Sequence, residues 1–101
     1  MRRDVFQGIA DPTRREILYL LTNKDLTLNQ VADNFKITRP AISKHIKILT
    51  ECGLVTIRNQ GRERYCRVNP KPLKEVNTWL EHFDKFWDAK LNSLKNYLEG
   101  K

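Results

Sequence analysis

The chain has 101 residues, 40% of them hydrophobic, and a formal net charge of +7. This length accommodates one hydrophobic core, so we expect a single domain over residues 1–101, and four Gly and four Pro are too few for a disordered chain. No stretch approaches eighteen apolar residues and no apolar segment follows Arg2-Arg3, which argues against a membrane span and a secretory signal and predicts a cytoplasmic protein.

Two helices are predicted before residue 25. Apolar residues at positions 5, 6 and 9 predict a short amphipathic helix that ends before Asp11. Asp11 is a typical N-cap and Pro12 suits the first helical position, so a second helix begins there. Arg14 and Arg15, in its first turns, either contact phosphates or are solvated. The apolar face of this helix comprises Ile17, Leu18, Leu20 and Leu21.

A helix-turn-helix is predicted between residues 27 and 53. Thr27 and Gln30 have the spacing of a capping box at the start of one helix, and Thr38 is the N-cap of the next. Gly53 suits the left-handed residue that follows a helix end. Two short helices joined by a tight turn are typical of DNA-binding proteins. The apolar stripe of the second helix comprises Ile42, Ile46 and Leu49.

The opposite side of this second helix is basic. It presents Arg39, Ser43, Lys44 and Lys47. Such a face is either a solvated surface or one that enters the DNA major groove, where Arg recognises guanine and small side chains permit close approach. The neighbouring charge favours DNA: residues 36–67 hold eight Lys or Arg against two Glu, a net charge of +6, whereas the remainder of the chain carries +1.

A β-hairpin is predicted directly after this helix. Residues 54–57 and 64–68 are short β-branched or aromatic runs, and they flank a turn over 59–62 in which Gly61 can adopt a positive φ. An edge hairpin kept soluble by charge would have this composition. Its position after the basic helix instead indicates a wing that contacts phosphates or a narrow minor groove. Arginines line it at Arg58, Arg62, Arg64 and Arg67, and we predict DNA contacts for Arg58, Gln60, Arg62 and Arg64.

A long amphipathic helix is predicted over about residues 71–98. Apolar residues recur along it in steps of three and four, and many are aromatic. One helix of a small domain rarely needs so much apolar surface for its own core, so we expect a second copy of the chain to cover it. Packing against residues 5–9 of the same chain is a partial alternative. The predicted dimer interface comprises Val5, Phe6, Leu73, Val76, Trp79, Leu80, Phe83, Phe86, Trp87, Leu91 and Leu94.

Four stretches carry a family resemblance: residues 9–18, 39–49, 52–55 and 61–65. In this order and combination they resemble the ArsR-type winged helix-turn-helix repressors of bacteria and archaea. The resemblance implies a mostly α fold with a small β-hairpin wing and a long C-terminal dimerisation helix. It also implies a homodimer that represses transcription by covering operator DNA, and hence a cytoplasmic, nucleoid-associated, prokaryotic protein.

The same resemblance implies which residues touch DNA. It places Thr38 and Arg39 at the entrance of the recognition helix, and it assigns DNA contacts to Ser43 and His45. For His45, a half-buried position on the helix is the alternative. A two-fold dimer presents two recognition helices related by symmetry, so we expect the operator to be an inverted repeat.

Metal sensing and catalysis are not expected. Many members of the resembled family bind metal through a Cys-x-Cys pair before the recognition helix, whereas residues 28–33 contain no thiol. In the last helix, His82 stands beside two acids, which are too few neutral or soft ligands for zinc. Ser43 and His45 point about 200° apart on one helix and cannot act as nucleophile and base. We therefore expect no cofactor and no enzymatic activity, and the sequence identifies no small-molecule effector.

Two other functions are the alternatives to a metal-independent repressor. The first is a thiol- or metal-responsive repressor. Cys52 and Cys66 match no disulfide or zinc pattern and are typical of a reducing compartment, but Cys66 would be reactive if the basic strand exposed it. The second is a dimeric interaction module without specific DNA binding, against which the local charge of +6 argues.

Overall fold

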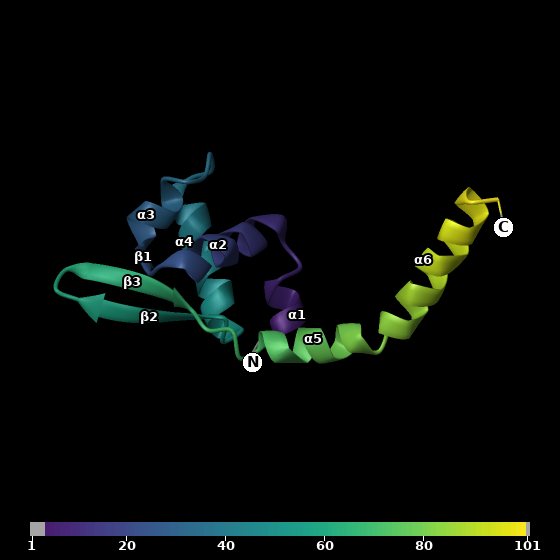
Figure 1. Cartoon of the computed structure of the whole chain (residues 1–101). Helices are drawn as coiled ribbons and strands as arrows, with labels where there is room; N and C mark the ends of the chain where they lie inside the picture. Colours follow the sequence, from purple (N-terminus) through teal and green to yellow (C-terminus); the bar gives the residue numbers. More distant parts are fainter. Residues whose placement is uncertain (1–3, 101) are drawn as a thin grey trace.

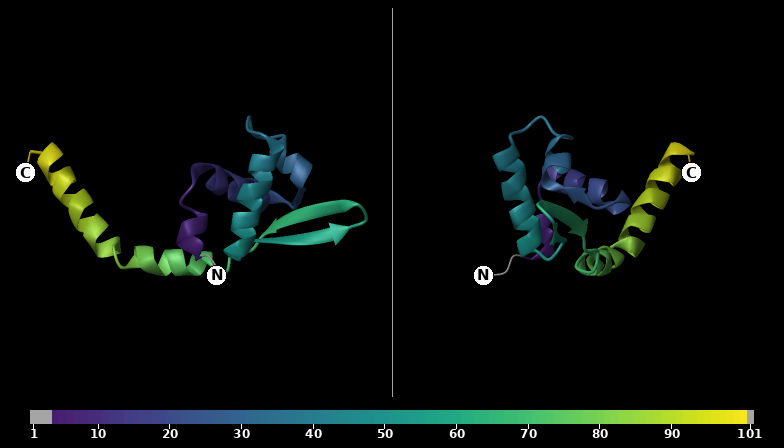
Figure 2. Two further views of the ribbon diagram at one scale, coloured as in Figure 1. Left: turned by 180° about the vertical axis from the view of Figure 1, so that it is seen from behind. Right: turned by 90° about the vertical axis from the view of Figure 1, so that its left-hand side faces the viewer.

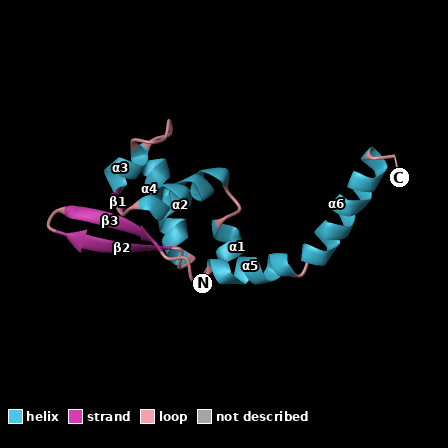
Figure 3. Cartoon of the chain, viewed as in Figure 1, coloured by secondary structure: helices cyan, strands magenta, loops and turns pink. Residues whose placement is uncertain are grey.

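The computed structural model describes residues 4–100, which form a helical body with a small sheet on one side and a projecting C-terminal arm, residues 73–98 (Figures 1 and 3). The molecule extends 64 Å along its longest axis and 29 and 23 Å across it. This is the predicted winged helix-turn-helix, mostly helical with a β-hairpin wing. The elements are α1 (Val5–Gly8), α2 (Pro12–Asn23), β1 (Leu26–Thr27), α3 (Leu28–Ala32), α4 (Arg39–Glu51), β2 (Val55–Gln60), β3 (Glu63–Val68), α5 (Leu73–Glu81) and α6 (Asp84–Leu98).

Side-chain caps begin the helices where the sequence predicts them. The Asp11 carboxylate accepts a hydrogen bond from the Arg14 N–H at 3.1 Å and starts α2. Thr27 and Gln30 form both hydrogen bonds of a capping box, at 3.1 and 2.9 Å, and start α3. The Thr38 hydroxyl accepts from the third residue of α4 at 3.3 Å. These caps satisfy N–H groups that a helix start would leave unpaired, so the helix boundaries are set locally.

The core lies between α1, α2, α3, α4 and the sheet. Its most enclosed side chains, each 0% exposed, are Ile17, Val31, Ile42, Leu49 and Leu54. They include members of the two apolar stripes predicted for α2 and α4. Val5, which the sequence placed in the dimer interface, is only 2% exposed and belongs to this core, because α1 folds back onto the body of its own chain.

The sheet has the order β1-β3-β2 and is antiparallel throughout. Asn59 and Gln60, predicted as part of the turn, instead continue β2 and pair with Arg64 and Glu63, so the turn is the two residues after Gln60. Gly61 there has φ +62°, the left-handed conformation that was predicted. β1 was not predicted, because its two residues show no strand pattern. They pair with β3 because the folded chain brings the two segments side by side.

The predicted continuous helix over residues 71–98 is wrong at one point: the segment divides into α5 and α6 at His82–Phe83 (Figures 1 and 2). The N–H groups of His82 and Phe83 donate to carbonyls three residues back, at 3.2 and 2.9 Å, which tightens the last turn of α5 and ends its α-helical ladder. The Phe83 ring also packs edge-on against Trp79, with centroids 5.0 Å apart. No Gly or Pro marks this break in the sequence.

The two halves of this C-terminal segment have different surroundings. Helix α5 contacts α1, and the rings of Phe6 and Trp79 meet edge-on with centroids 5.7 Å apart. Helix α6 instead projects away from the body in each view of Figures 1 and 2. The predicted packing of the C-terminal stripe against residues 5–9 is therefore confirmed for α5 but not for α6. Within residues 4–100, no helix combines the length and apolar character that crossing a bilayer requires.

Candidate DNA-binding surface

Helix α4 is oriented by its apolar stripe. Ile42, Ile46 and Leu49 are 0%, 5% and 0% exposed, so this stripe fixes the helix against the core. The opposite face then carries its basic residues outward, and Arg39, Lys44 and Lys47 are all exposed. Helix α3 packs against α4, as the first helix of a helix-turn-helix does. The face of α4 that was predicted to contact DNA therefore lies on the surface of the protein.

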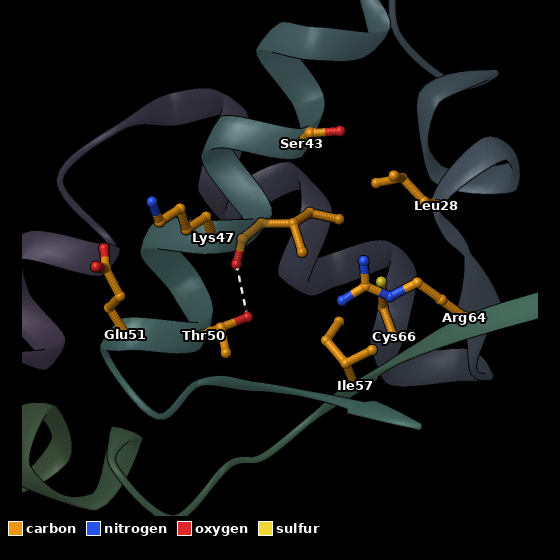
Figure 4. Close-up of a pocket in the computed structure, with 9 residues that line it drawn as sticks. Leu28, Ser43, Lys47, Thr50, Glu51, Ile57, Arg64 and Cys66 are labelled. Atoms are coloured by element: carbon orange, nitrogen blue, oxygen red, sulfur yellow. Dashed lines mark hydrogen bonds between the residues drawn. The ribbon is translucent and has the colours of Figure 1, made fainter. Parts of the chain in front are cut away.

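A groove of about 350 Å³ separates α4 from the hairpin (Figure 4). Its floor is apolar and its rim is polar. In Figure 4, Arg64 extends from β3 above Cys66 toward α4, whereas the ammonium group of Lys47 points away from the groove. Ser43 lies on the α4 side of the groove. The residues that line the groove are Leu28, Ser43, Ile46, Lys47, Thr50, Glu51, Ile57, Arg64 and Cys66. Recognition helix and wing thus form one continuous surface around Arg64.

The predicted wing residues divide between two faces of the hairpin. Arg64 lies on the same face as Cys66, two residues away, and this inner face of the hairpin turns toward α4. Arg58 and Gln60 lie on the opposite, outer face of the hairpin, where the Arg58 guanidinium donates to Gln60 Oε1 at 2.8 Å. Arg62 is at the turn and is exposed. The four residues predicted to contact DNA therefore do not act from one face.

An ion-pair cluster that the sequence did not predict lies on the outer face of the wing. Asp25, just before β1, accepts from Arg67 Nε at 3.1 Å and lies 3.0 Å from a terminal nitrogen of the same guanidinium. Arg58 is 3.6 Å from the same carboxylate. The hydrogen bond from Arg67, together with the charges of both arginines, lowers the pKa of Asp25 against a smaller effect of burial. No sequence pattern links residues 25 and 67, because only the pairing of β1 with β3 brings them together.

His45 faces α2 rather than open solvent. Its side chain is 21% exposed, and Nδ1 lies 3.9 Å from the Asp11 carboxylate and 3.4 Å from a guanidinium nitrogen of Arg14. This geometry favours the half-buried alternative for His45. The half-buried Arg14 donates to the carbonyl oxygen of Gly8 at 2.9 Å and thereby caps the end of α1. Arg15 donates likewise to the carbonyl oxygen of Ile9 at 2.7 Å.

Both cysteines are buried thiols. Cys52 is 3% exposed and Cys66 is 1% exposed. Burial raises the pKa of the Cys66 thiol, and the nearby charge of Arg64 opposes this only in part. The condition under which Cys66 would be a reactive thiolate, exposure on the basic strand, is therefore not met.

The basic α4 face and the adjoining hairpin define a winged helix-turn-helix DNA-binding protein. Residues 11–56 match the family model described as bacterial regulatory protein, arsR family. The chain is 36% identical to the transcriptional repressor SdpR of Bacillus subtilis (strain 168) over 80 residues, which are 79% of this chain and 89% of SdpR. The chain belongs to the ArsR family; it is a DNA-binding transcriptional regulator and not an enzyme.

Solved structures agree with this assignment. The crystal structure of a possible transcriptional regulator for arsenical resistance superimposes with a TM-score of 0.74 at 42% identity, covering 91% of this chain and 93% of that one. An ArsR-like transcriptional regulator from Rhodococcus sp. RHA1 also gives a TM-score of 0.74, at 34% identity, covering 96% of this chain and 89% of that one. The similarity therefore includes the C-terminal arm as well as the DNA-binding body.

Proposed function

We propose that the protein is a homodimeric, cytoplasmic repressor that binds an inverted-repeat operator. The observation that supports the dimer is the uncovered apolar surface of α5 and α6. A monomer rarely exposes so many large apolar side chains together, and a second copy of the arm would cover them. The exposed residues, each between 38% and 80% accessible, are Trp79, Leu80, Phe83, Phe86, Trp87, Leu91, Leu94, Tyr97 and Leu98.

The DNA contacts are proposed from the exposed basic side chains. On α4 these are Arg39, Lys44 and Lys47, with Ser43 close to the groove. On the wing, Arg62 at the turn and Arg64 on the inner face extend the same surface. Phosphate contacts by these side chains would supply most of the affinity, and base contacts in the major groove would supply the specificity. Repression is proposed because a relative, SdpR, is named as a repressor.

The proposed repressor acts without a metal. Its helix before the recognition helix has no thiol at residues 28–33. In the described part of the chain, no three His, Cys, Asp or Glu side chains come together in a way that could hold a metal ion. Some relatives are named arsenical resistance operon repressors; for this chain we propose repression that needs no metal.

Sedimentation velocity tests the dimer. Trp87 is 56% exposed on α6, so Trp87→Glu leaves the core of the chain intact while placing a charge in the proposed interface. We expect the wild-type protein to sediment as a dimer, and the variant to sediment as a monomer and to lose operator binding. Asn92→Glu adds the same charge on the opposite side of α6 and serves as the control, which stays dimeric. A dimeric Trp87→Glu protein would place the interface elsewhere.

A further inference from the structure

The outer face of the wing is electrically neutral, unlike the rest of the DNA-binding surface. Arg58 and Arg67 are its positive charges, and Asp25 and Glu63 are its negative ones. The inner face has Arg64 and no acid on either strand, and the turn adds Arg62. The hairpin therefore attracts phosphates through one face and its tip, although arginines occur on both faces.

Asp25 is the residue that creates this difference. Its side chain is 23% exposed, whereas those of Arg58 and Arg67 are 52% and 62% exposed. Next to it in the chain, Leu26 is paired with Cys66 in the sheet, so the Asp25 backbone is fixed beside β3. Three close nitrogen–oxygen contacts, at 3.0, 3.1 and 3.2 Å, hold the Arg67 guanidinium in a bidentate geometry.

Arg58 is restrained by further contacts besides Asp25. Its guanidinium donates to Gln60 Oε1 at 2.8 Å and lies 5.2 Å from the centre of the Tyr65 ring, within the range of a cation–π contact. A phosphate that recruited Arg58 or Arg67 would have to replace contacts already formed within the chain. DNA of random sequence binds mainly through its phosphates, so the affinity for random DNA would increase most if these contacts were absent.

We propose that Asp25 is a specificity-determining residue, which withholds Arg58 and Arg67 from DNA phosphates and so limits binding to random sequence. The proposal rests on the proposed DNA-binding function, and it revises the contact that the sequence predicts for Arg58. Asp25 itself touches no DNA; it positions the two arginines and neutralises them. The wing then contacts DNA through Arg62 and Arg64.

The test measures the affinity of the full chain for a short duplex of random sequence over a range of salt concentrations. Asp25→Asn keeps the size of the side chain and removes its charge. Each arginine that it releases to a phosphate should steepen the slope of log affinity against log salt by about 0.9 per protomer. Asp33→Asn is the matched control, because Asp33 is an exposed acid that pairs with no cation within residues 4–100, and it should leave the slope unchanged.

A second variant guards against an effect of Asp25 on wing structure. In the wild-type background, Arg67→Ala should leave the slope unchanged. In the Asp25→Asn background, it should remove part of the steepening that Asp25→Asn causes. Equal slopes for wild type and Asp25→Asn, or a flatter slope for Arg67→Ala alone, would overturn the proposal. A wild-type protein without salt-dependent DNA binding would instead contradict the proposed function itself, so the two failures are distinguishable.

Discussion

The sulfur of Cys52 lies 3.0 Å from the point that a Cβ atom on Gly8 would occupy, and Leu54 Cδ1 lies 2.8 Å from it. This contact sets how closely α1 approaches the end of α4. Because both neighbours are buried, a methyl group at position 8 would have to displace core side chains. We expect Gly8→Ala to lower the free energy of unfolding by about 1–3 kcal/mol, as overpacking does in other cores. Chemical denaturation measures this change.

The same substitution in a Leu54→Ala background is the control for Gly8→Ala. Truncating Leu54 removes the closest atom, so the cost of the added methyl group should be smaller there and the two changes should be non-additive. An equal loss of unfolding free energy in both backgrounds would show that the contact with Leu54 does not cause the destabilisation.

Two basic residues of the DNA-binding surface should behave differently when truncated. Arg62→Ala, at the wing turn, should lower affinity for all sequences and flatten the salt dependence by about 0.9 for each phosphate that the variant no longer binds. Arg39→Ala, at the start of α4, should instead reduce discrimination between operator and random DNA. Fluorescence anisotropy with both duplexes at several salt concentrations separates the two effects. Affinity that does not vary with salt would contradict the electrostatic part of the surface.

The turn of the wing should control the edges of the footprint. Gly61 has φ +62° and no atom lies within 4 Å of a Cβ built on it, so the constraint there is purely conformational. Gly61→Val should misdirect the tip and lose protection of the flanking minor grooves while keeping the centre of the operator protected. Gly61→Asn, which tolerates this conformation better, should keep more of the flanking protection.

Hydroxyl-radical footprinting reports both the wing and the dimer. For the wild-type protein we expect two half-sites whose centres are about 10 bp apart or a near multiple of that spacing. A single asymmetric protected patch would contradict the two-fold arrangement.

The charge of Asp11 should stabilise the fold above acidic pH. Burial of this carboxyl would raise its pKa, but the N–H of Arg14 and the charges of His45 and Arg14 outweigh burial and lower it. A lowered pKa means that the unfolded chain binds the proton more readily, so stability is present above the ordinary aspartate value of about 3.9 and is lost as pH falls through the lower folded value.

The matched substitution is Asp11→Asn, because Asn is an equally good N-cap and only the charge changes. Wild type should be more stable than the variant near neutral pH, and the difference should vanish in acid below the folded pKa. Denaturation at a series of pH values measures this difference. A difference that persists unchanged in acid would show that the charge is not responsible.

Cys66 should be unreactive in the folded protein. It is 1% exposed and burial raises the pKa of its thiol, so little thiolate is available. A thiol reagent at mildly alkaline pH should label it slowly in native protein and rapidly after denaturation, and mild oxidants should leave DNA binding unchanged. Rapid native labelling of Cys66 that abolishes DNA binding would favour a thiol-responsive repressor.

Features that depend on residues close together in the chain were predictable from the sequence. Asp11, Thr27 and Thr38 cap nearby N–H groups, and the stripe from Ile42 to Leu49 decides which face of α4 is buried. Gly61 marks the hairpin turn in the same local way. These signals sufficed for the winged helix-turn-helix and for a basic outward face on α4, because caps, helical periodicity and turn conformation depend on neighbours in the chain.

The contacts between charged groups on this surface depend instead on the three-dimensional fold. Asp25 and Arg67 are 42 positions apart, and their contact follows from the register of β1 on β3. His45 turns toward Asp11 because α4 crosses α2, and α6 separates from α5 where Phe83 packs on Trp79 without a helix-breaking residue. Ion pairs and ring contacts need only a short distance in space, which no spacing along the chain specifies, so the sequence predicted the presence of these charges and not their partners.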